Sequence, residues 1–347
     1  MGTPDSHRRY SVLAGPSGRC AVRFALAALL ALAGVLLPPW VAAPTALAAD
    51  PVIFHVGLRP LGVAVTPDGH RLYVTDTTLS RVSVFDTATN KAVGRVRVGS
   101  SPSAVAVTPD GRRAYVTNAG SDDVSVFDTA TDEAVARVRV GSFPFGVALS
   151  PDGRRAYVTN AGSDDVSVID TATNEVVGTP LRVGSTPVDV AVTPDGSHAY
   201  VTNSGFGSPA PVSVIDTSTH RVVGLPVSVG NFPLAVAATP DGRHVYVTDQ
   251  AGTVSVIDTG TGKVTGGPIP VGFKPADVAV SPDGRRAYVT SVQPGKVSVI
   301  DTGTDKVTGT AISLGMSDTA DRIALSPDGH HAYVTFSSGG AVAVVDI

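Results

Sequence analysis

Residues 150–184, SPDGRRAYVTNAGSDDVSVIDTATNEVVGTPLRVG, contain the pattern from which most of the chain is built. The Pro-Asp-Gly at 151–153 predicts a tight turn, because Pro presets φ and Gly tolerates positive φ. Residues 156–159 are aromatic and β-branched, and residues 166–170 alternate apolar and polar, so both segments predict strands. A further strand is expected at 175–183. The stretch shows no helical period and therefore reads as short β segments separated by turns.

The same unit is repeated along the chain. The Pro-Asp-Gly turn recurs at spacings of 42 to 46 residues, beginning at Pro67, Pro109, Pro151, Pro194, Pro240, Pro282 and Pro327. Each turn is followed by a strand with a tyrosine and by a Val-rich strand that ends in an aspartate. Four strands in a repeat of roughly 40–45 residues are typical of β-propeller blades. We therefore predict an all-β fold, a seven-bladed β-propeller with four-stranded antiparallel blades.

The two ends of the repeat region complement each other. The seventh copy stops at Asp346-Ile347, at the close of its third strand. Residues 51–57, PVIFHVG, match the fourth strand of other copies, such as residues 181–184. We expect this N-terminal strand to close the last blade, because ring closure removes two sheet edges that would otherwise be exposed.

These repeats resemble the YVTN family of β-propeller proteins. The motif Tyr-Val-Thr-Asn stands at residues 115–118 and 157–160, and a near copy ends in Asp at 246–249. The resemblance covers about residues 51–347 and implies a surface-layer-type exported propeller. It implies an architecture and no single activity, so the function has to be argued from individual sites.

Residues 1–48 predict a secretory signal peptide, and the propeller is expected to span residues 49–347. Four arginines precede or begin an apolar run at 24–37, and the sequence Ala-Leu-Ala at 46–48 is typical of a cleavage site. A membrane anchor is the alternative, but the run is short and meets two prolines. We expect a secreted, extracellular protein with no stable membrane span once the leader is removed.

Composition excludes several classes of function. The single cysteine, Cys20, lies in the leader, so the mature chain would have no disulfide, no thiolate nucleophile and no Cys-ligated zinc. Without residues 1–48 the chain has 22 basic and 29 acidic residues, a net charge of about −7. This charge argues against a nucleic-acid partner. We expect a monomer that carries no cofactor.

The inner strands carry the sharpest candidate for a ligand site. Five residues before each turn proline, four repeats have Gly or Ala, whereas the fourth, sixth and seventh have Asp189, Asp277 and Arg322. All should lie near one mouth of the central channel, on the face opposite the Pro-Asp-Gly turns, where charges are costly unless paired or solvated. We predict a ligand site there; an internal ion-pair network, or plain solvation of the charges, is the alternative. Its further members are Asp321, Phe145, Phe232 and Phe273.

A second candidate is a basic ring on the other face. Of the fourteen residues that follow the Pro-Asp-Gly turns in pairs, thirteen are Arg or His. Such a ring would attract an anionic wall polymer or lipid headgroups. The alternative is that these residues merely belong to the repeated pattern and that the aspartate of each turn neutralises their charge. The Arg-Arg pairs are Arg112, Arg113, Arg154, Arg155, Arg285 and Arg286.

Signals for catalysis are scarce. The mature chain has only two glutamates, Glu133 and Glu175, both in peripheral strands, and its histidines are not expected at the channel mouth. It has no nucleophile elbow, zinc-protease motif, phosphate loop or haem-attachment motif. We therefore assign no catalytic residue and no metal, although an Asp-only metal site stays open.

The sequence is interpreted as a secreted, non-enzymatic propeller that binds a partner at the cell surface, such as a cell-wall polymer, a glycan or another protein. Two alternatives stay open. One is a hydrolase or lyase resembling the propeller lactonases, with its site at Asp189, Asp277 and Arg322. The other is a structural extracellular scaffold without a dedicated ligand.

Overall fold

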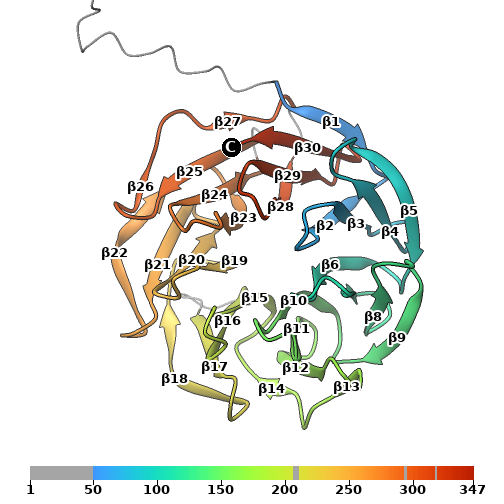
Figure 1. Ribbon diagram of the computed structural model, residues 1–347. Helices are drawn as coiled ribbons and strands as arrows, with labels where there is room; N and C mark the ends of the chain where they lie inside the picture. The colour runs from blue at the N-terminus through green and yellow to red at the C-terminus, as the bar shows by residue number, and fades with distance from the viewer. Residues whose placement is uncertain (1–49, 206–210, 293–294, 317–318) are drawn as a thin grey trace, which may run out of the picture. The chain divides into compact units, whose positions relative to one another are not determined.

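The computed structural model describes residues 50–205, 211–292, 295–316 and 319–347. These residues form no helix and fold into seven antiparallel sheets arranged as a ring, as Figure 1 shows. The prediction of a seven-bladed β-propeller is confirmed. No described segment is a helix long and apolar enough to cross a membrane.

Blades 1 to 3 follow the repeats in order, each running from an inner to an outer strand. Blade 1 contains β2 (Pro60–Val65), β3 (Arg71–Asp76), β4 (Arg81–Asp86) and β5 (Lys91–Arg97). Blade 2 contains β6 (Pro102–Val107), β7 (Arg113–Asn118), β8 (Asp123–Asp128) and β9 (Ala134–Arg139). Blade 3 contains β10 (Pro144–Leu149), β11 (Arg155–Asn160), β12 (Asp165–Asp170), β13 (Glu175–Val176) and β14 (Leu181–Arg182).

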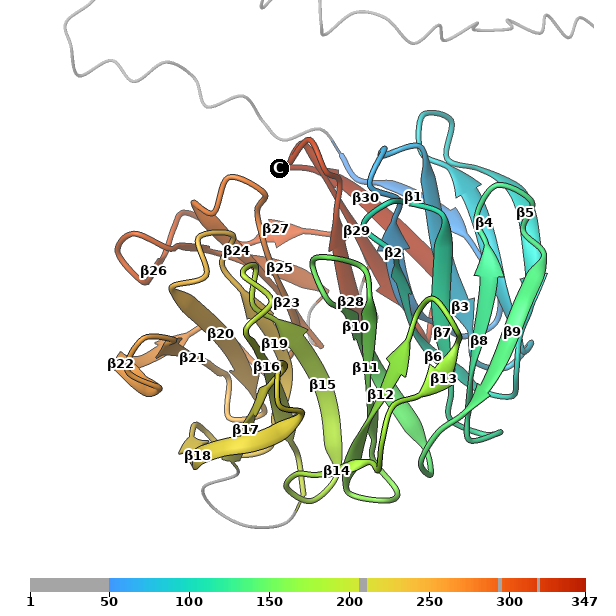
Figure 2. The same ribbon diagram turned by 60° about the horizontal axis from the view of Figure 1, so that its bottom comes forward.

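Blades 4 to 7 complete the ring, and the turned view in Figure 2 shows the outer strands β18 and β22 at its rim. Blade 4 contains β15 (Pro187–Val192), β16 (His198–Asn203), β17 (Pro211–Asp216) and β18 (Arg221–Ser228). Blade 5 contains β19 (Pro233–Ala238), β20 (His244–Asp249), β21 (Thr253–Asp258) and β22 (Lys263–Pro270). Blade 6 contains β23 (Pro275–Val280), β24 (Arg286–Ser291), β25 (Lys296–Asp301), β26 (Lys306–Val307) and β27 (Ile312–Ser313). Blade 7 contains β28 (Ala320–Leu325), β29 (His331–Phe336), β30 (Ala341–Asp346) and β1 (Val52–His55).

Blades 3 and 6 have five strand segments because their outer strand is interrupted. In blade 3 both β13 and β14 pair with β12, and in blade 6 both β26 and β27 pair with β25. Gly178 and Gly309 lie in the interruptions with φ of 67° and 64°, a left-handed conformation that glycine adopts without steric cost. Each pair of segments therefore acts as one broken fourth strand.

Apolar side chains are buried between successive blades rather than in one central core. One cluster joins Tyr73 and Val84 of blade 1 to Val105, Val116 and Phe127 of blade 2. The Tyr73 and Phe127 rings pack edge to face with centroids 5.2 Å apart, a favoured geometry for aromatic pairs. Because the same arrangement repeats between neighbours, each blade depends on the next for its burial.

Buried threonines of the second strands link the blades near the channel. The Thr75 hydroxyl accepts a hydrogen bond from the Gly62 N–H of its own blade at 2.7 Å and donates to the Ser103 carbonyl of the next blade at 3.1 Å. The Thr335 hydroxyl of blade 7 likewise donates to the Leu61 carbonyl of blade 1 at 2.8 Å. These bonds fix each inner strand against its neighbour and complete the circle.

The N-terminal strand closes the last blade, as predicted. Strand β1 pairs antiparallel with β30, with Val52 opposite Val344 and His55 opposite Ala341. Phe54 then packs on Phe85 of blade 1, with ring centroids 4.8 Å apart. The predicted leader, residues 1–48, lies outside the described residues.

Candidate functional site

The candidate site is built on the third residue of the inner strands. In four blades this residue is small: Gly62, Ala104, Gly146 and Ala235. In blades 4, 6 and 7 it is Asp189, Asp277 and Arg322, and its N–H donates to the threonine of the second strand at 3.0–3.1 Å. The backbone at all three charged residues is therefore held rigidly, which orients their side chains.

Arg322 joins the two aspartates into one cluster. Its Nη1 lies 3.4 Å from Asp277 Oδ1 in the adjacent blade and 3.5 Å from Asp189 Oδ2 in blade 4. Blades 4 and 7 are separated by two blades along the ring, so the second ion pair spans the central channel. The three side chains are only 11–17% exposed. The structure thus brings together Asp189, Asp277 and Arg322 as the sequence suggested.

Backbone N–H groups hold both carboxylates from the adjacent blades. Asp189 Oδ2 accepts from the Val236 N–H at 3.1 Å, and Asp277 Oδ2 accepts from the Ile323 N–H at 2.9 Å. Asp277 Oδ1 also accepts from the Val278 N–H at 2.9 Å. These donors fix the carboxylates in place before any ligand arrives.

Burial and charge act in opposite directions on this cluster. Burial raises the pKa of Asp277 to about 6; the Arg322 guanidinium opposes that shift, and the Asp189 carboxylate reinforces it. Burial opposes the charge on Arg322, but Asp277 and Asp189 outweigh it and raise the pKa of Arg322 above its ordinary value. A carboxylate with a pKa near neutrality, beside a permanent cation, is suited to accept and return a proton.

Arg322 retains donors that the cluster does not use. Its Nη1 lies near both carboxylates, and no described residue accepts a hydrogen bond from its Nε or Nη2. The Phe145 ring lies 5.7 Å from the guanidinium carbon and covers it with a cation–π contact. The guanidinium is thus fixed in place yet can still donate to an additional oxygen.

The other predicted residues are not all part of this cluster. Asp321 points elsewhere: its Oδ2 accepts from the Ser337 N–H at 2.7 Å, and burial raises its pKa. Phe232 and Phe273 lie on the entry turns of blades 5 and 6, with exposures of 36% and 59%. Among the described residues no group of three or more His, Cys, Asp or Glu side chains is arranged to hold a metal ion.

The predicted basic ring divides into two kinds of arginine. Arg112 and Arg154 are more than four-fifths exposed and lie 4.0 and 3.9 Å from the aspartates of their own turns. Arg113 instead donates to the Thr171 carbonyl of the next blade at 2.7 Å, and Arg155 pairs with Asp170. Attraction of an anionic polymer by Arg112, Arg113, Arg154, Arg155, Arg285 and Arg286 stays a prediction.

Comparison with known proteins relates this propeller to enzymes and cofactor-binding domains. A family model described as lactonase, seven-bladed β-propeller, matches residues 71–181, and one for the cytochrome d1 haem domain matches residues 201–335. A chain of Kuenenia stuttgartiensis hydrazine synthase is 26% identical, with a TM-score of 0.76 over 88% of this chain and 98% of that chain, so the likeness includes most of the ring. No curated protein sequence matches the chain.

These similarities correct one interpretation. The sequence was interpreted as a non-enzymatic binding module, and that interpretation is wrong: the matched propellers are lactonases, haem domains and part of a synthase. It relied on the absence of Glu, His and Cys motifs. An Asp–Arg cluster assembled from three distant strands has no local motif to detect.

The residues of this mouth do not fit a haem group. The seven inner strands contain no His, Cys, Met or Tyr that could serve as an axial ligand. Met316, on the entry to blade 7, packs against the apolar cluster between blades 6 and 7. The space a macrocycle would need is spanned by the Arg322 ion pairs. We therefore assign no chemistry through haem.

Sequence reasoning missed the groups that support the cluster. The N–H groups of Val236 and Ile323 donate to the two carboxylates. The hydroxyls of Thr202, Thr290 and Thr335 accept from the backbone N–H groups of the three charged residues. The Thr of each Tyr-Val-Thr segment was a usable signal, because its place beside the inner strand follows from the repeat register. The backbone donors have no sequence signature.

Proposed function

We propose that the protein is a hydrolase that opens lactones at the channel mouth. The observation that carries this proposal is the Arg322 guanidinium, which is fixed between Asp189 and Asp277 yet has Nε and Nη2 available. The substrate class comes from the family model that matches blades 1 to 3. A propeller of this class needs an oxyanion donor and a base, and the cluster provides both.

The reaction uses Asp277 twice. Its carboxylate accepts a proton from water while the water oxygen bonds to the lactone carbonyl carbon. The carbonyl oxygen becomes an oxyanion, which accepts hydrogen bonds from Arg322. The ring C–O bond then breaks, and the leaving oxygen takes the proton back from Asp277. The product is a hydroxy acid, whose ionisation releases one proton to solvent.

Asp189 positions the guanidinium rather than reacting. It lies across the channel from Arg322 and draws the guanidinium over the axis at 3.5 Å. Its own Oδ2 is held by the Val236 N–H. With Asp277 protonated in the intermediate, Asp189 keeps Arg322 paired while the oxyanion is present.

The experiment is a lactone-hydrolysis assay that follows proton release over a panel of γ- and δ-lactones. Asp277→Asn keeps the shape of the side chain and an oxygen for the Ile323 N–H, but removes the base, so kcat/KM should fall by about 100-fold or more. Asp170→Asn, in the outlying pair with Arg155, is the matched control and should retain full activity. Unchanged turnover in Asp277→Asn, or a folded wild-type protein that opens no lactone, would overturn the proposal.

We also propose that the chain is an exported protein with YVTN-type repeats, of the surface-layer kind. The Tyr-Val-Thr-Asn segments at 115–118 and 157–160 and the leader-like residues 1–48 support this assignment. Fractionation of cells that express the full chain tests it. Recovery of an uncleaved chain in the cytoplasm would contradict it.

A further inference from the structure

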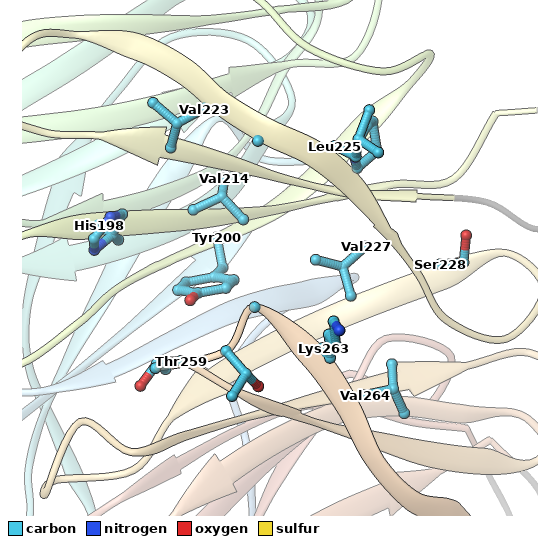
Figure 3. A pocket seen from close by; sticks show the side chains of 15 residues that line it. His198, Tyr200, Val214, Val223, Leu225, Val227, Ser228, Thr259, Lys263 and Val264 are labelled. Carbon is cyan, nitrogen blue, oxygen red and sulfur yellow. The ribbon is translucent and has the colours of Figure 1, made fainter.

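A cavity of about 590 Å³ lies between blades 4 and 5 and shares no residue with the channel-mouth cluster. Its lining comes from β16, β17 and β18, from the turn before β22 and from the start of β22, and Figure 3 shows the side chains. Its walls include Val223, Leu225 and Val264, and Leu225 is 89% exposed. An apolar side chain this exposed beside a cavity is a candidate wall for a bound molecule.

One side chain of the repeat is missing beside this pocket. In blades 1 to 6 the turn after the third strand ends in a left-handed residue, which is Asn174 in blade 3 and Asp305 in blade 6. The side chains of these two residues accept hydrogen bonds from the tyrosine of the preceding blade, at 2.9 Å from Tyr115 and 2.6 Å from Tyr246, whereas Asn90 of blade 1 makes no such bond. In blade 5 the same position is Gly262, with φ 65°, and a Cβ added there would meet no atom within 4 Å.

The Tyr200 hydroxyl has no side chain of this kind opposite it. Tyr200 is only 2% exposed and lines the pocket, and its hydroxyl makes no hydrogen bond to any residue that the structure describes. Of the other hydroxyls that line the pocket, Thr259 donates to the Gly242 carbonyl at 2.7 Å and Thr261 donates to Asp258 Oδ1 at 2.7 Å, while Ser228 is exposed. The hydroxyl opens onto the pocket, so an acceptor bound there can take its hydrogen bond.

The charged residues around Tyr200 determine which kind of ligand atom can accept a hydrogen bond from its hydroxyl. Burial raises the pKa of Tyr200, and the carboxylates of Asp195 and Asp258 raise it further, so the hydroxyl stays a donor. Those carboxylates oppose a second negative charge at the hydroxyl, although Lys263 also lines the pocket. A neutral carbonyl oxygen accepts the hydrogen bond without that repulsion.

We propose that this pocket binds a small neutral molecule that combines a carbonyl oxygen with an apolar body. The oxygen accepts a hydrogen bond from the Tyr200 hydroxyl, and the body packs against Val223, Leu225 and Val264. The site is independent of lactone opening at the channel mouth.

Titration of the full chain with 2-octanone, followed by two-dimensional amide NMR, tests this proposal. Shifts should concentrate on the amides of Leu225 and Gly262. Gly262→Asn introduces the side chain that accepts from the tyrosine in blade 3, occupies the part of the pocket beside Tyr200 and competes for its hydroxyl, so the dissociation constant should rise by about tenfold or more. Gly266→Asn is the matched control: Gly266 has φ 64° and open space around its Cβ but does not line the pocket.

A second variant distinguishes a loss of binding from a loss of folding. Leu225→Ser removes an exposed side chain and should weaken 2-octanone binding while the melting temperature stays unchanged. Octanoate, with a carboxylate in place of the ketone, should bind more weakly. Absence of 2-octanone binding, equal binding by wild type and Gly262→Asn, or tighter binding of octanoate would each overturn the proposal.

Discussion

At the scale of single residues, three positions of the inner ring depart from the small residues of the other blades. Arg322 and its two aspartates are largely removed from water. The Arg322 Nη1 instead lies 3.4–3.5 Å from a carboxylate oxygen of each aspartate. A buried triad of this kind adds little net stability relative to small apolar residues, although loss of one member is expensive. This small net contribution to stability is what the proposed catalytic role of the triad would lead us to expect.

Removal of the cation alone should leave two facing carboxylates. Arg322→Met is expected to lower the free energy of unfolding by about 3–5 kcal/mol near pH 8. The raised pKa of Asp277 should rise further without its cation. A carboxyl whose pKa is higher in the folded state stabilises the fold fully at pH below its unfolded-state pKa of about 3.9. That stabilisation is lost as the pH rises through the folded-state pKa. The loss should therefore be smaller at about pH 5.

Urea unfolding at the two pH values measures this difference. Arg155→Met, which breaks the more exposed pair with Asp170, is the control and should show little change at either pH. A loss of equal size for Arg322→Met at both pH values would show that Asp277 does not titrate as described.

At the scale of elements, the turns are held by ionised aspartates. Asp195 accepts hydrogen bonds from the Thr193 hydroxyl and from the N–H and hydroxyl of Ser197, and these bonds lower its pKa to about 2. The Ser218 and Thr219 donors lower the pKa of Asp216 to about 2 as well. Stability from such groups is present above the unfolded pKa and lost as pH falls through the folded pKa.

Replacement of a turn aspartate should therefore alter acid sensitivity. Asp195→Asn is expected to lower the melting temperature modestly at neutral pH, and the difference from wild type should shrink as pH falls from about 4 to about 2. Calorimetry across that range measures it. A difference that stays constant with pH would indicate a packing effect rather than loss of an ionised acceptor.

The sequence pattern predicted the strands and turns correctly but did not predict the breaks in the outer strands. The Pro-Asp-Gly turns and tyrosine strands fall where predicted, because turn chemistry and alternation are local. The broken outer strands at Gly178 and Gly309 were not predicted. Gly224 and Gly266 have the same left-handed conformation in the unbroken strands β18 and β22, so the glycine alone does not decide where an outer strand breaks. Tyr200 and Gly262 face each other only after adjacent blades pack, although the missing Asn or Asp in the turn was readable from the repeats.

At the scale of the whole molecule, closure by β1 was predictable from the unmatched segment at 51–57. The meeting of Arg322 and Asp189 was predictable only as proximity to one mouth. Whether a side chain of blade 7 reaches blade 4 depends on the channel radius and on rotamers, which no repeat pattern specifies. The main functional interpretation was wrong, whereas its alternative, a lactonase-like enzyme with its site at Asp189, Asp277 and Arg322, agrees better with the family similarities. The three residues could be named from the repeats, but no motif assigned them a reaction.

The central claim is that the triad serves catalysis and the ring does not need it. The most direct measurement is lactone turnover by a variant carrying Asp189→Ala, Asp277→Ala and Arg322→Ala, which gives all seven blades the small inner residue of Gly62, Ala104, Gly146 and Ala235. We expect a folded propeller, at least as stable as wild type by thermal unfolding, with no lactone hydrolysis above background. Retained turnover, or a variant that fails to fold, would contradict the account and leave the triad a structural feature.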